Sequence, residues 1–345
     1  MHTKRTEPVT ERSAWTARDL AADPSWQYTM SAAQVEELDR ATRTAIASGL
    51  KAAEFTREQF ALPTLGPRIA ALSDEVENGR GVAMLRGVPV QRYDTDAIRV
   101  LYWGFGVHAG IPISQNSKGQ LIAEVSDKGN DYGDRNTRGF ATNAELAPHV
   151  DTSDMTTLLC LRGARSGGES KVVSSTTVYN TILTEHPEYL DILYRGFHND
   201  LRGEGPSGDI NELTVNRVPV YSYCDARVSC SFNYRMIENA AEKSGVPLSA
   251  LERAALDFLR EVSMREELTL RFTMAPGDIQ MVSNHSVFHS RTTFIDHDEP
   301  DKRRCLLRIW TNMREGRKLE PDFAARYNTG PRGGVAVGKG ARYVF

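Results

Sequence analysis

The sequence is short of cysteine, of long apolar runs and of unbalanced charge, and each shortage argues against a class of protein. Its four cysteines form no C-x-x-C pair, which argues against a structural zinc site, and four scattered thiols in 345 residues do not suggest a disulfide framework. No run of eighteen apolar residues occurs, so no membrane-spanning helix is expected. Forty-two basic against forty-five acidic residues leave a formal charge of −3, without the basic excess of a nucleic-acid-binding protein.

Two sequence signals are also missing. The opening stretch, MHTKRTEPVTERSAW, carries charges but no apolar segment of the secretory kind, so we expect the protein in the cytoplasm. No G-x-G-x-x-G follows an expected strand, and strands do not alternate with helices at the spacing of βαβ units. A Rossmann fold is therefore not expected.

What is present is a set of helical patterns and many short strands. The composition, 40% hydrophobic and 25% charged, is that of an ordinary globular protein. Helical periodicity occurs at 31–49, 56–79, 94–105, 177–194 and 247–262. Strand-like runs occur at 82–85, 121–125, 150–161, 170–174, 218–223, 228–232, 267–274, 278–282 and 304–311.

Short strands separated by long insertions suggest an antiparallel sandwich or a jelly roll with flanking helices, and we expect a mainly β fold with a jelly-roll (double-stranded β-helix) core. We expect a single domain. Its parts would be a helical buttress (1–105), the jelly-roll core (106–312) with a helical insert at about 177–265, and a C-terminal tail (313–345). The polar, aperiodic stretch 198–217 is expected to be a long loop that lies over a site.

The stretch LAPHVDT contains a candidate for half of a metal site. In an extended strand, residues two apart point to the same face, so His149 and Asp151 would project side by side. Together with a distant second histidine they would form the two-His, one-carboxylate triad of non-haem Fe(II) enzymes, which leaves metal positions open. A His-x-Asp pair also arises by chance, and a polar pair on an edge strand is the alternative.

The other half of such a site has candidates near the end of the chain. In GDIQMVSNHSVFHSRTTF, either His285 or His289 could complete the triad. Shortly after, Arg304 and Arg308 share one face of an expected strand. Because a guanidinium grips a carboxylate with a planar fork, two arginines behind a metal site suit a dicarboxylate or an anionic substrate.

Taken in order, these motifs resemble the TauD/TfdA group of Fe(II)- and 2-oxoglutarate-dependent dioxygenases, which are clavaminate-synthase-like. The resemblance runs from about residue 106 to residue 311. The motifs that carry it are HVD at 149–151, GGES at 167–170, PGDIQ with NHSVFHSRT at 276–292, and RRCLLRIW at 303–310.

The resemblance implies roles for particular residues. His149, Asp151 and His289 would hold Fe(II), since the family's distal ligand is the histidine before Ala/Ser-Arg-Thr. Arg304 would bind the distal carboxylate of 2-oxoglutarate, and Ser170, where the family commonly has threonine, would add a hydroxyl.

The resemblance also implies a reaction. 2-Oxoglutarate and O2 would be co-substrates, with succinate formed as a small molecule of specialised metabolism is hydroxylated. Related halogenases have glycine or alanine in place of Asp151, so hydroxylation is expected here, although desaturation and cyclisation use the same triad.

Other polar side chains are weaker candidates for a substrate pocket, and each could equally be a structural hydrogen-bonder: Arg308, Gln115, Asn143, Asn116, Asn233 and Arg235. Two other functions stay open at this stage. One is a jelly-roll metal enzyme that uses no 2-oxo acid, and the other is a non-catalytic binding module of the same fold. The sequence does not reveal the substrate or the oligomeric state.

Overall fold

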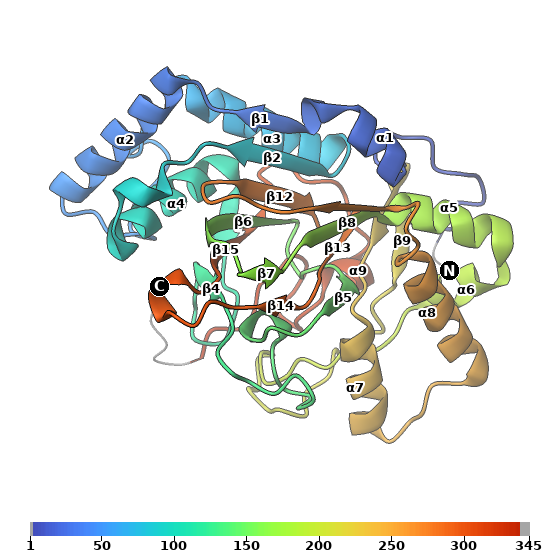
Figure 1. Ribbon diagram of the computed structural model, residues 1–345. Coiled ribbons are helices and arrows are strands. Elements are labelled where there is room, and N and C mark those ends of the chain that lie inside the picture. Colours follow the sequence, from blue (N-terminus) through green and yellow to red (C-terminus); the bar gives the residue numbers. More distant parts are fainter. Residues whose placement is uncertain (1–2, 339–345) are drawn as a thin grey trace.

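The core of the molecule is a pair of β-sheets that face each other as a jelly roll (Figure 1). The computed structural model describes residues 3–338. In this range the larger sheet contains, in spatial order, β1 (Gln27–Thr29), β2 (Val82–Arg86), β12 (Ile279–Ser283), β6 (Met155–Arg162), β15 (Cys305–Asn312) and β3 (Ile111–Ile113), with β4 (Ala123–Val125) also paired to β15. The smaller sheet contains β11 (Thr269–Phe272), β8 (Ser170–Ser174), β13 (Val287–Arg291) and β5 (Leu146–His149).

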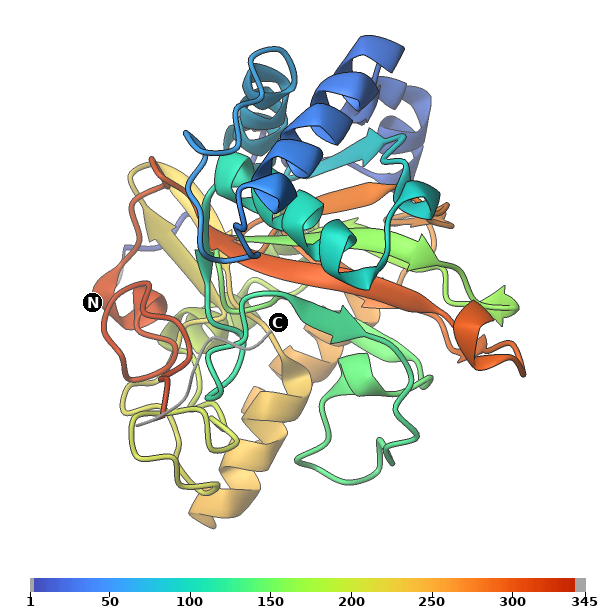
Figure 2. The same cartoon turned by 90° about the vertical axis from the view of Figure 1, so that its left-hand side faces the viewer.

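Helices cover the outer faces of both sheets, and the views of Figures 1 and 2 agree on this arrangement. The N-terminal helices are α1 (Ala17–Ala22), α2 (Ala32–Ala47), α3 (Leu65–Asn78) and α4 (Thr95–Ala109). The later helices are α5 (Ser175–Glu185), α6 (Glu188–Arg195), α7 (Tyr234–Ser244), α8 (Ala250–Val262) and α9 (Pro321–Ala324). Two small ribbons, β9 (Tyr221–Cys224) with β10 (Arg227–Cys230) and β7 (Ser166–Gly167) with β14 (Phe294–Ile295), complete the strands.

Alternation along the strands of the larger sheet separates an outer from an inner face. On β15, Leu307 and Ile309 pack outward against the cluster formed with helices α2, α3 and α4. Leu306 points inward, into the cluster between the two sheets, and Arg304 and Arg308 share that inner side. The expected division of this strand into two faces is therefore confirmed.

The outer face of the smaller sheet is covered by the helices inserted between its strands. Val173 of β8 and Phe288 of β13 pack there against Ile182, Leu193 and Leu259 of α5, α6 and α8. Burying each such apolar side chain contributes roughly 1.5–3 kcal/mol to the stability of the fold. Apolar clusters therefore cover the outer faces of both sheets, and polar side chains line a cavity between the sheets.

Several elements differ from those expected. The helix expected at 56–79 begins only at Leu65, and the strand expected at 150–161 begins only at Met155, after a bend at 152–154. The single helix expected at 177–194 is two helices, separated at Pro187, which has no N–H to continue the first. Helix α7 was not expected; the Asn233 side chain caps it by accepting from Met236 N, and Gly245 ends it with a positive φ of 66°.

The C-terminal segment packs against the core as far as residue 338. Phe323 and Tyr327 are buried, and Ser114 Oγ donates to the carbonyl of Val335 at 2.8 Å. Arg326 Nη1 lies 3.4 Å from the carbonyl oxygen of Asp151. The segment therefore forms part of the wall behind the candidate metal site, whereas the division into a single domain with a tail stays a prediction.

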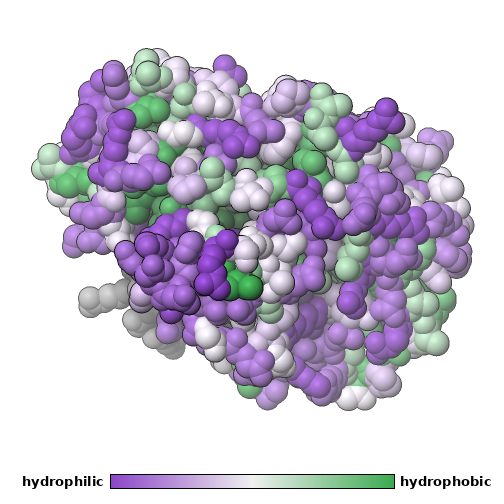
Figure 3. Space-filling model, in the orientation of Figure 1, coloured by the Kyte–Doolittle hydropathy of each residue, from purple (hydrophilic) through white to green (hydrophobic). Residues whose placement is uncertain are grey.

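Across residues 3–338, no helix is both long and apolar enough to cross a bilayer. The face seen in Figure 3 is mainly hydrophilic, with small scattered apolar patches.

Candidate active site between the two sheets

Two histidines far apart in the sequence lie directly opposite each other in the smaller sheet. His149 on β5 pairs with His289 on the antiparallel strand β13, and their ring centroids are 4.5 Å apart. Directly opposed residues of antiparallel strands place their side chains together on one face. Strand register is therefore what brings the two imidazoles together.

Asp151 joins them from outside the strand, contrary to the expectation that it shares a strand with His149. Strand β5 ends at His149, and the backbone N–H of Asp151 donates to Asn284 Oδ1 at 3.0 Å. Carboxylate oxygen Oδ2 accepts from Trp310 Nε1 and from Thr156 Oγ1, each at 2.8 Å. The carboxylate is held in place by donors from β6 and β15, not by strand geometry.

The three side chains together form a site that could hold one metal ion. One potential ligand atom from each lies within 4.8 Å of the others, and His289 Nε2 is 3.6 Å from Asp151 Oδ2. His149 Nδ1 donates to the carbonyl of Ala147 at 2.8 Å, which leaves Nε2 as the ring's lone-pair atom. Two imidazoles and one carboxylate are the donor set of non-haem Fe(II) sites, so the residues fit the metal.

The charge states also suit metal binding. Burial, with a contribution from neighbouring His289, lowers the pKa of His149 to about 4, so its imidazole is neutral near pH 7. Burial alone would raise the pKa of Asp151, but Arg308 and the two imidazoles outweigh it and hold that pKa well below its usual value. A neutral imidazole and an ionised carboxylate are the forms that bind metals.

His285, the other candidate from the sequence, is engaged elsewhere. Its Nε2 donates to Asp154 Oδ1 at 2.9 Å, and Arg326 Nη2 lies 3.3 Å from its Nδ1. Asp154 Oδ2 in turn accepts from Arg332 Nη1 at 2.5 Å. His285 thus belongs to a buried polar network that joins the C-terminal segment to the core, while His289 faces the other two members of the triad.

A cavity between the sheets opens beside the triad, and we call it the inner cavity. Its walls include Ser170, Gln280, His289, Arg291, Arg304 and Arg308. Among the described residues, several buried polar atoms on these walls have no hydrogen-bond partner: Gln280 Oε1, His289 Nδ1, Arg291 Nε and Nη1, Arg304 Nη1 and Arg308 Nη2. Since unsatisfied buried donors are costly, unpaired guanidinium N–H groups here fit a bound acid with carboxylates at both ends.

The Gly-Gly pair of the GGES motif explains how Arg304 and Ser170 come together. Gly167 has a φ of +70°, and a Cβ there would lie 2.3 Å from the carbonyl oxygen of Thr293. Only glycine permits this close approach of β7 to the chain at β14. The turn packs Phe294 under the Arg304 guanidinium, whose carbon lies 5.0 Å from the ring centroid.

The weaker candidates have different positions. Arg308 Nη1 lies 3.6 Å from Asp151 Oδ1, and its Nε donates to Gln115 Oε1 at 2.7 Å. Gln115 thus lies behind Arg308 and holds its guanidinium. It does not line the inner cavity, nor the second cavity described below. Asn143 is exposed and lines neither cavity, and its backbone carbonyl accepts from Phe294 N and Thr293 Oγ1. The structure therefore does not bring Asn143 to the site.

Arg291 was not singled out from the sequence, although a signal for it was present. It lies two residues after His289 on β13, so both side chains point to the same face. Arg291 Nη2 donates to the carbonyls of Thr142, at 2.9 Å, and Ala144. The rest of its guanidinium faces the inner cavity.

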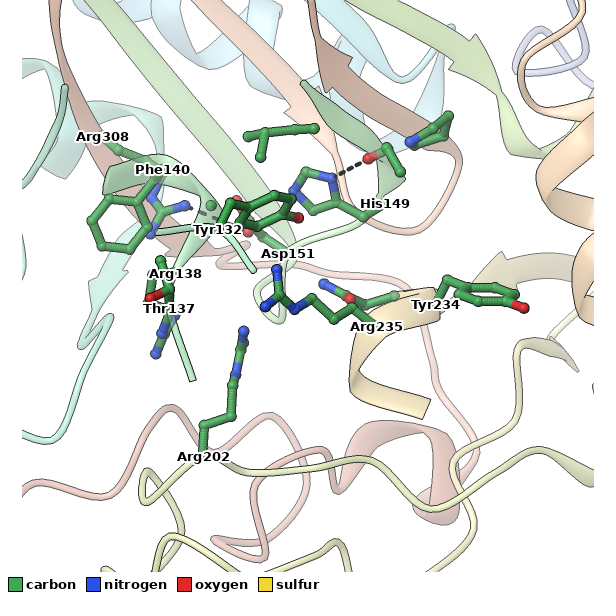
Figure 4. Close-up of a pocket in the computed structure, with 15 residues that line it drawn as sticks. Tyr132, Thr137, Arg138, Phe140, His149, Asp151, Arg202, Tyr234, Arg235 and Arg308 are labelled. Atoms are coloured by element: carbon green, nitrogen blue, oxygen red, sulfur yellow. Dashed lines mark hydrogen bonds and ion pairs between the residues drawn. The ribbon is translucent and has the colours of Figure 1, made fainter. Parts of the chain in front are cut away.

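A second cavity lies on the other side of the triad, and we call it the outer cavity. It shares Phe140, Leu146, His149, Asp151 and Arg308 with the inner cavity. Three further arginines come from separate segments, and Figure 4 shows their guanidinium groups directed into one space: Arg138 before β5, Arg202 from the loop after α6, and Arg235 at the start of α7. Arg202 comes from the 198–217 loop that was expected to lie over a site, and Asn233 and Arg235 also line this cavity.

Comparison with known proteins gives matches along most of the chain. Residues 44–310 match the family described as "Taurine catabolism dioxygenase TauD, TfdA family". FR-33289 synthase of Streptomyces rubellomurinus (strain ATCC 31215) is 32% identical over 317 residues, which cover 91% of this chain and 93% of that protein. Uridine-5'-phosphate dioxygenase of Amycolatopsis sp is 28% identical over 183 residues, 49% of this chain and 62% of that protein.

Solved structures share the fold at low sequence identity. Asparagine oxygenase in complex with Fe(II), 2S,3S-3-hydroxyasparagine and succinate has a TM-score of 0.65 at 15% identity, covering 83% of this chain and 93% of that one. The non-haem iron oxygenase OrfP in complex with Fe and alpha-ketoglutaric acid has a TM-score of 0.59 at 13% identity, covering 83% and 94%. At these identities the likeness concerns the fold.

Proposed function

Because the chain belongs to the taurine catabolism dioxygenase TauD, TfdA family, we propose that His149, Asp151 and His289 are its Fe(II) ligands. The chain is an Fe(II)- and 2-oxoglutarate-dependent dioxygenase that acts on a small molecule. The observation that carries the ligand assignment is the convergence of the three side chains, whose potential ligand atoms lie within 4.8 Å of one another beside the inner cavity. When bound, Fe(II) with 2-oxoglutarate and O2 supplies the oxidising chemistry.

The residues around the triad would orient its members. The Ala147 carbonyl fixes which nitrogen of His149 carries the proton, and Trp310 and Thr156 hold one oxygen of Asp151. Such partners of metal ligands set ligand orientation and basicity. Arg308 and Gln115 then act as positioning residues, because the guanidinium that Gln115 holds keeps Asp151 ionised.

The inner cavity would take 2-oxoglutarate. Arg304 binds the distal carboxylate, Ser170 adds a hydroxyl, and Arg291 is a further cation on the same wall. Support comes from the guanidinium atoms that lack a partner there. A metal enzyme that used no 2-oxo acid would need another anion to pair with these two buried, partly unpaired arginines beside its metal.

The outer cavity would take the substrate, which is hydroxylated. It reaches His149 and Asp151, so a molecule bound there meets the metal site from the side opposite to 2-oxoglutarate. Proteins similar to this chain are named for uridine 5'-phosphate and asparagine, and the latter is crystallised with its hydroxylated product. Both names refer to small polar molecules.

The direct test is anaerobic addition of Fe(II) and 2-oxoglutarate to the purified protein. A weak visible charge-transfer band should appear, and His149→Ala should abolish it. His186→Ala, at a half-buried histidine between α5 and α6 that lines neither cavity, is the matched control and should keep the band. No band in the wild-type protein, with metal bound, would favour a metal enzyme that uses no 2-oxo acid.

A non-catalytic binding module would behave differently again. Such a protein would show no thermal shift with Fe(II), Mn(II) or Zn(II), since a ligand that binds the folded state stabilises it. The expectations of a cytoplasmic location and of no nucleic-acid partner stay predictions.

A further inference from the structure

The outer cavity has more positive than negative charge on its walls. Four arginines line it, Arg138, Arg202, Arg235 and Arg308, and Asp151 is the one carboxylate among the described lining residues. Glu204, which pairs with Arg138, adds a second carboxylate nearby. If Asp151 binds the metal, its charge is not available to balance the arginines.

The remaining nearby acid is already neutralised. Asp200, two residues before Arg202, accepts from Lys243 Nζ at 2.8 Å and from Asn239 Nδ2 at 3.2 Å. Glu204 thus balances one of the three arginines Arg138, Arg202 and Arg235, and among the described residues that line the outer cavity no carboxylate other than Asp151 faces the two remaining positive charges.

Arg202 is held in the cavity at a cost to the backbone. Its φ is +51°, in the left-handed region that residues other than glycine seldom adopt. Its Nε is buried and has no hydrogen-bond partner among the described residues. A strained residue with an unpaired buried donor in a cavity is typical of a functional position.

The other two guanidiniums are oriented by neighbours that leave them facing the cavity. Arg235 stacks on Tyr132, with its guanidinium carbon 4.3 Å from the ring centroid, and donates to the carbonyl of Asp134. Figure 4 shows Arg235 directed toward Asp151 and Arg202 directed toward the same space from the opposite side. Burial is the main cause that lowers the pKa of Arg138 to about 9, and the nearby charge of Arg202 lowers it further.

We infer that the outer cavity recognises a substrate with a doubly charged tetrahedral oxyanion, a phosphate ester or a phosphonate, which Arg138, Arg202 and Arg235 surround. A phosphate or phosphonate group has three terminal oxygens, so it can present one pair of oxygens to each of the three guanidiniums. Its two negative charges match the excess positive charge of these side chains. A carboxylate has one charge and two oxygens, so it would leave one arginine unpaired. This inference rests on the proposed function, because it places the rest of the substrate at the metal site.

The test is binding of a small probe to the protein loaded with Zn(II) and 2-oxoglutarate without O2. Propylphosphonate, propanesulfonate and butyrate differ mainly in the anionic group, and isothermal titration gives the affinity of each. We expect propylphosphonate to bind at least about tenfold more tightly than the other two, because it alone can carry two charges. Equal affinity for butyrate, or tighter binding of propanesulfonate, would overturn the inference. Propyl phosphate, titrated in parallel, distinguishes an ester from a phosphonate substrate by which binds more tightly.

Variants locate the binding. Arg202→Gln and Arg235→Gln should each weaken propylphosphonate binding by about tenfold or more. Arg135→Gln is the matched control, because Arg135 is an exposed arginine that pairs with Glu242 and lines an adjoining groove but not the outer cavity. Unchanged affinity in both of the first two variants, with unaltered thermal midpoints, would contradict the inference.

The same samples separate this inference from the proposed function. Binding of Zn(II) and 2-oxoglutarate is measured first in each protein. If these bind and no phosphonate does, the anion inference alone fails. If neither binds, the proposed function fails as well.

Discussion

The two cavities share a wall that includes His149 and Asp151, whereas His289 lines the inner cavity alone, and the two are built in different ways. The inner cavity is enclosed by strands of both sheets, and its arginines, Arg291 and Arg304, lie on or next to β13 and β15. The outer cavity is enclosed largely by connecting segments and the start of α7, from which Arg138, Arg202 and Arg235 project. This division suggests that the strand-built inner cavity is a rigid pocket for the co-substrate, and that the loop-built outer cavity is a pocket for a particular substrate. Binding specificity is commonly placed on loops that a scaffold positions.

The largest effect is expected at the metal ligand that lines the inner cavity alone. His289→Ala removes a metal ligand and should weaken Mn(II) binding more than about 100-fold, since even partners of ligands contribute 10–100-fold. Electron paramagnetic resonance of Mn(II) measures the bound fraction, and product formation should fall below detection. His186→Ala should match the wild-type protein. Retention of metal by the His289 variant would contradict the assignment of His289 as a metal ligand.

A substitution confined to the inner cavity should separate the two pockets. Arg304→Leu removes a charge-assisted bond worth roughly 1.5–3 kcal/mol, so the dissociation constant for 2-oxoglutarate should rise about 10–150-fold. Propylphosphonate affinity should stay within about twofold, because Arg304 does not line the outer cavity. Arg303→Leu, at the exposed neighbour, is the control. A similar loss for both ligands would show that the pockets are not independent.

A smaller effect is expected from a residue that only orients a ligand. Trp310→Phe removes the indole N–H that donates to Asp151 Oδ2, and metal affinity should fall roughly tenfold. The pH at which metal binding is half lost should rise, because an oxygen that loses a donor holds its proton more tightly. Trp15→Phe, whose indole donates to the distant Arg80 carbonyl, controls for loss of packing. If the two variants bind metal equally well, Trp310 is structural only.

The smallest effect concerns the network behind the shared wall. Burial lowers the pKa of His285 from 6.5 to about 4, so the unfolded chain binds a proton that the folded protein rejects. His285 therefore costs no stability above pH 6.5 and progressively destabilises the fold as pH falls toward 4. Urea unfolding at pH 7, 6, 5 and 4.5 should show a shallower decline for His285→Gln than for the wild type. If the free energy of unfolding fell with pH equally in both proteins, His285 would not be buried in its neutral form.

The sequence predicts the inner cavity well because strands have a period of two. That period predicts that Arg304, just before β15, and Arg308, on β15, point to the same side, and in the structure both line the inner cavity. It would also have identified Arg291 from its distance to His289. The ligand set implied by the family motif is likewise a set that the structure brings within reach of one ion.

The outer cavity was largely hidden because loops have no period. Arg138 and Arg202 lie in segments without a repeating pattern, and nothing local shows that two residues 64 positions apart in the chain face one space. The irregular stretch at 150–154 was missed for a related reason. Its backbone N–H groups find partners on Phe232 and on the Asn284 side chain, and such long-range bonds leave no local signature.

The central claim is that one metal at His149, Asp151 and His289 faces 2-oxoglutarate on its inner side. A crystal structure of the protein soaked without O2 in Mn(II) and 2-oxoglutarate tests it most directly. The account predicts Mn(II) on these three residues, with the distal carboxylate of the oxo acid against Arg304 and Ser170. Metal on His285 and Asp154, or the oxo acid bound among the three arginines of the outer cavity, would contradict it.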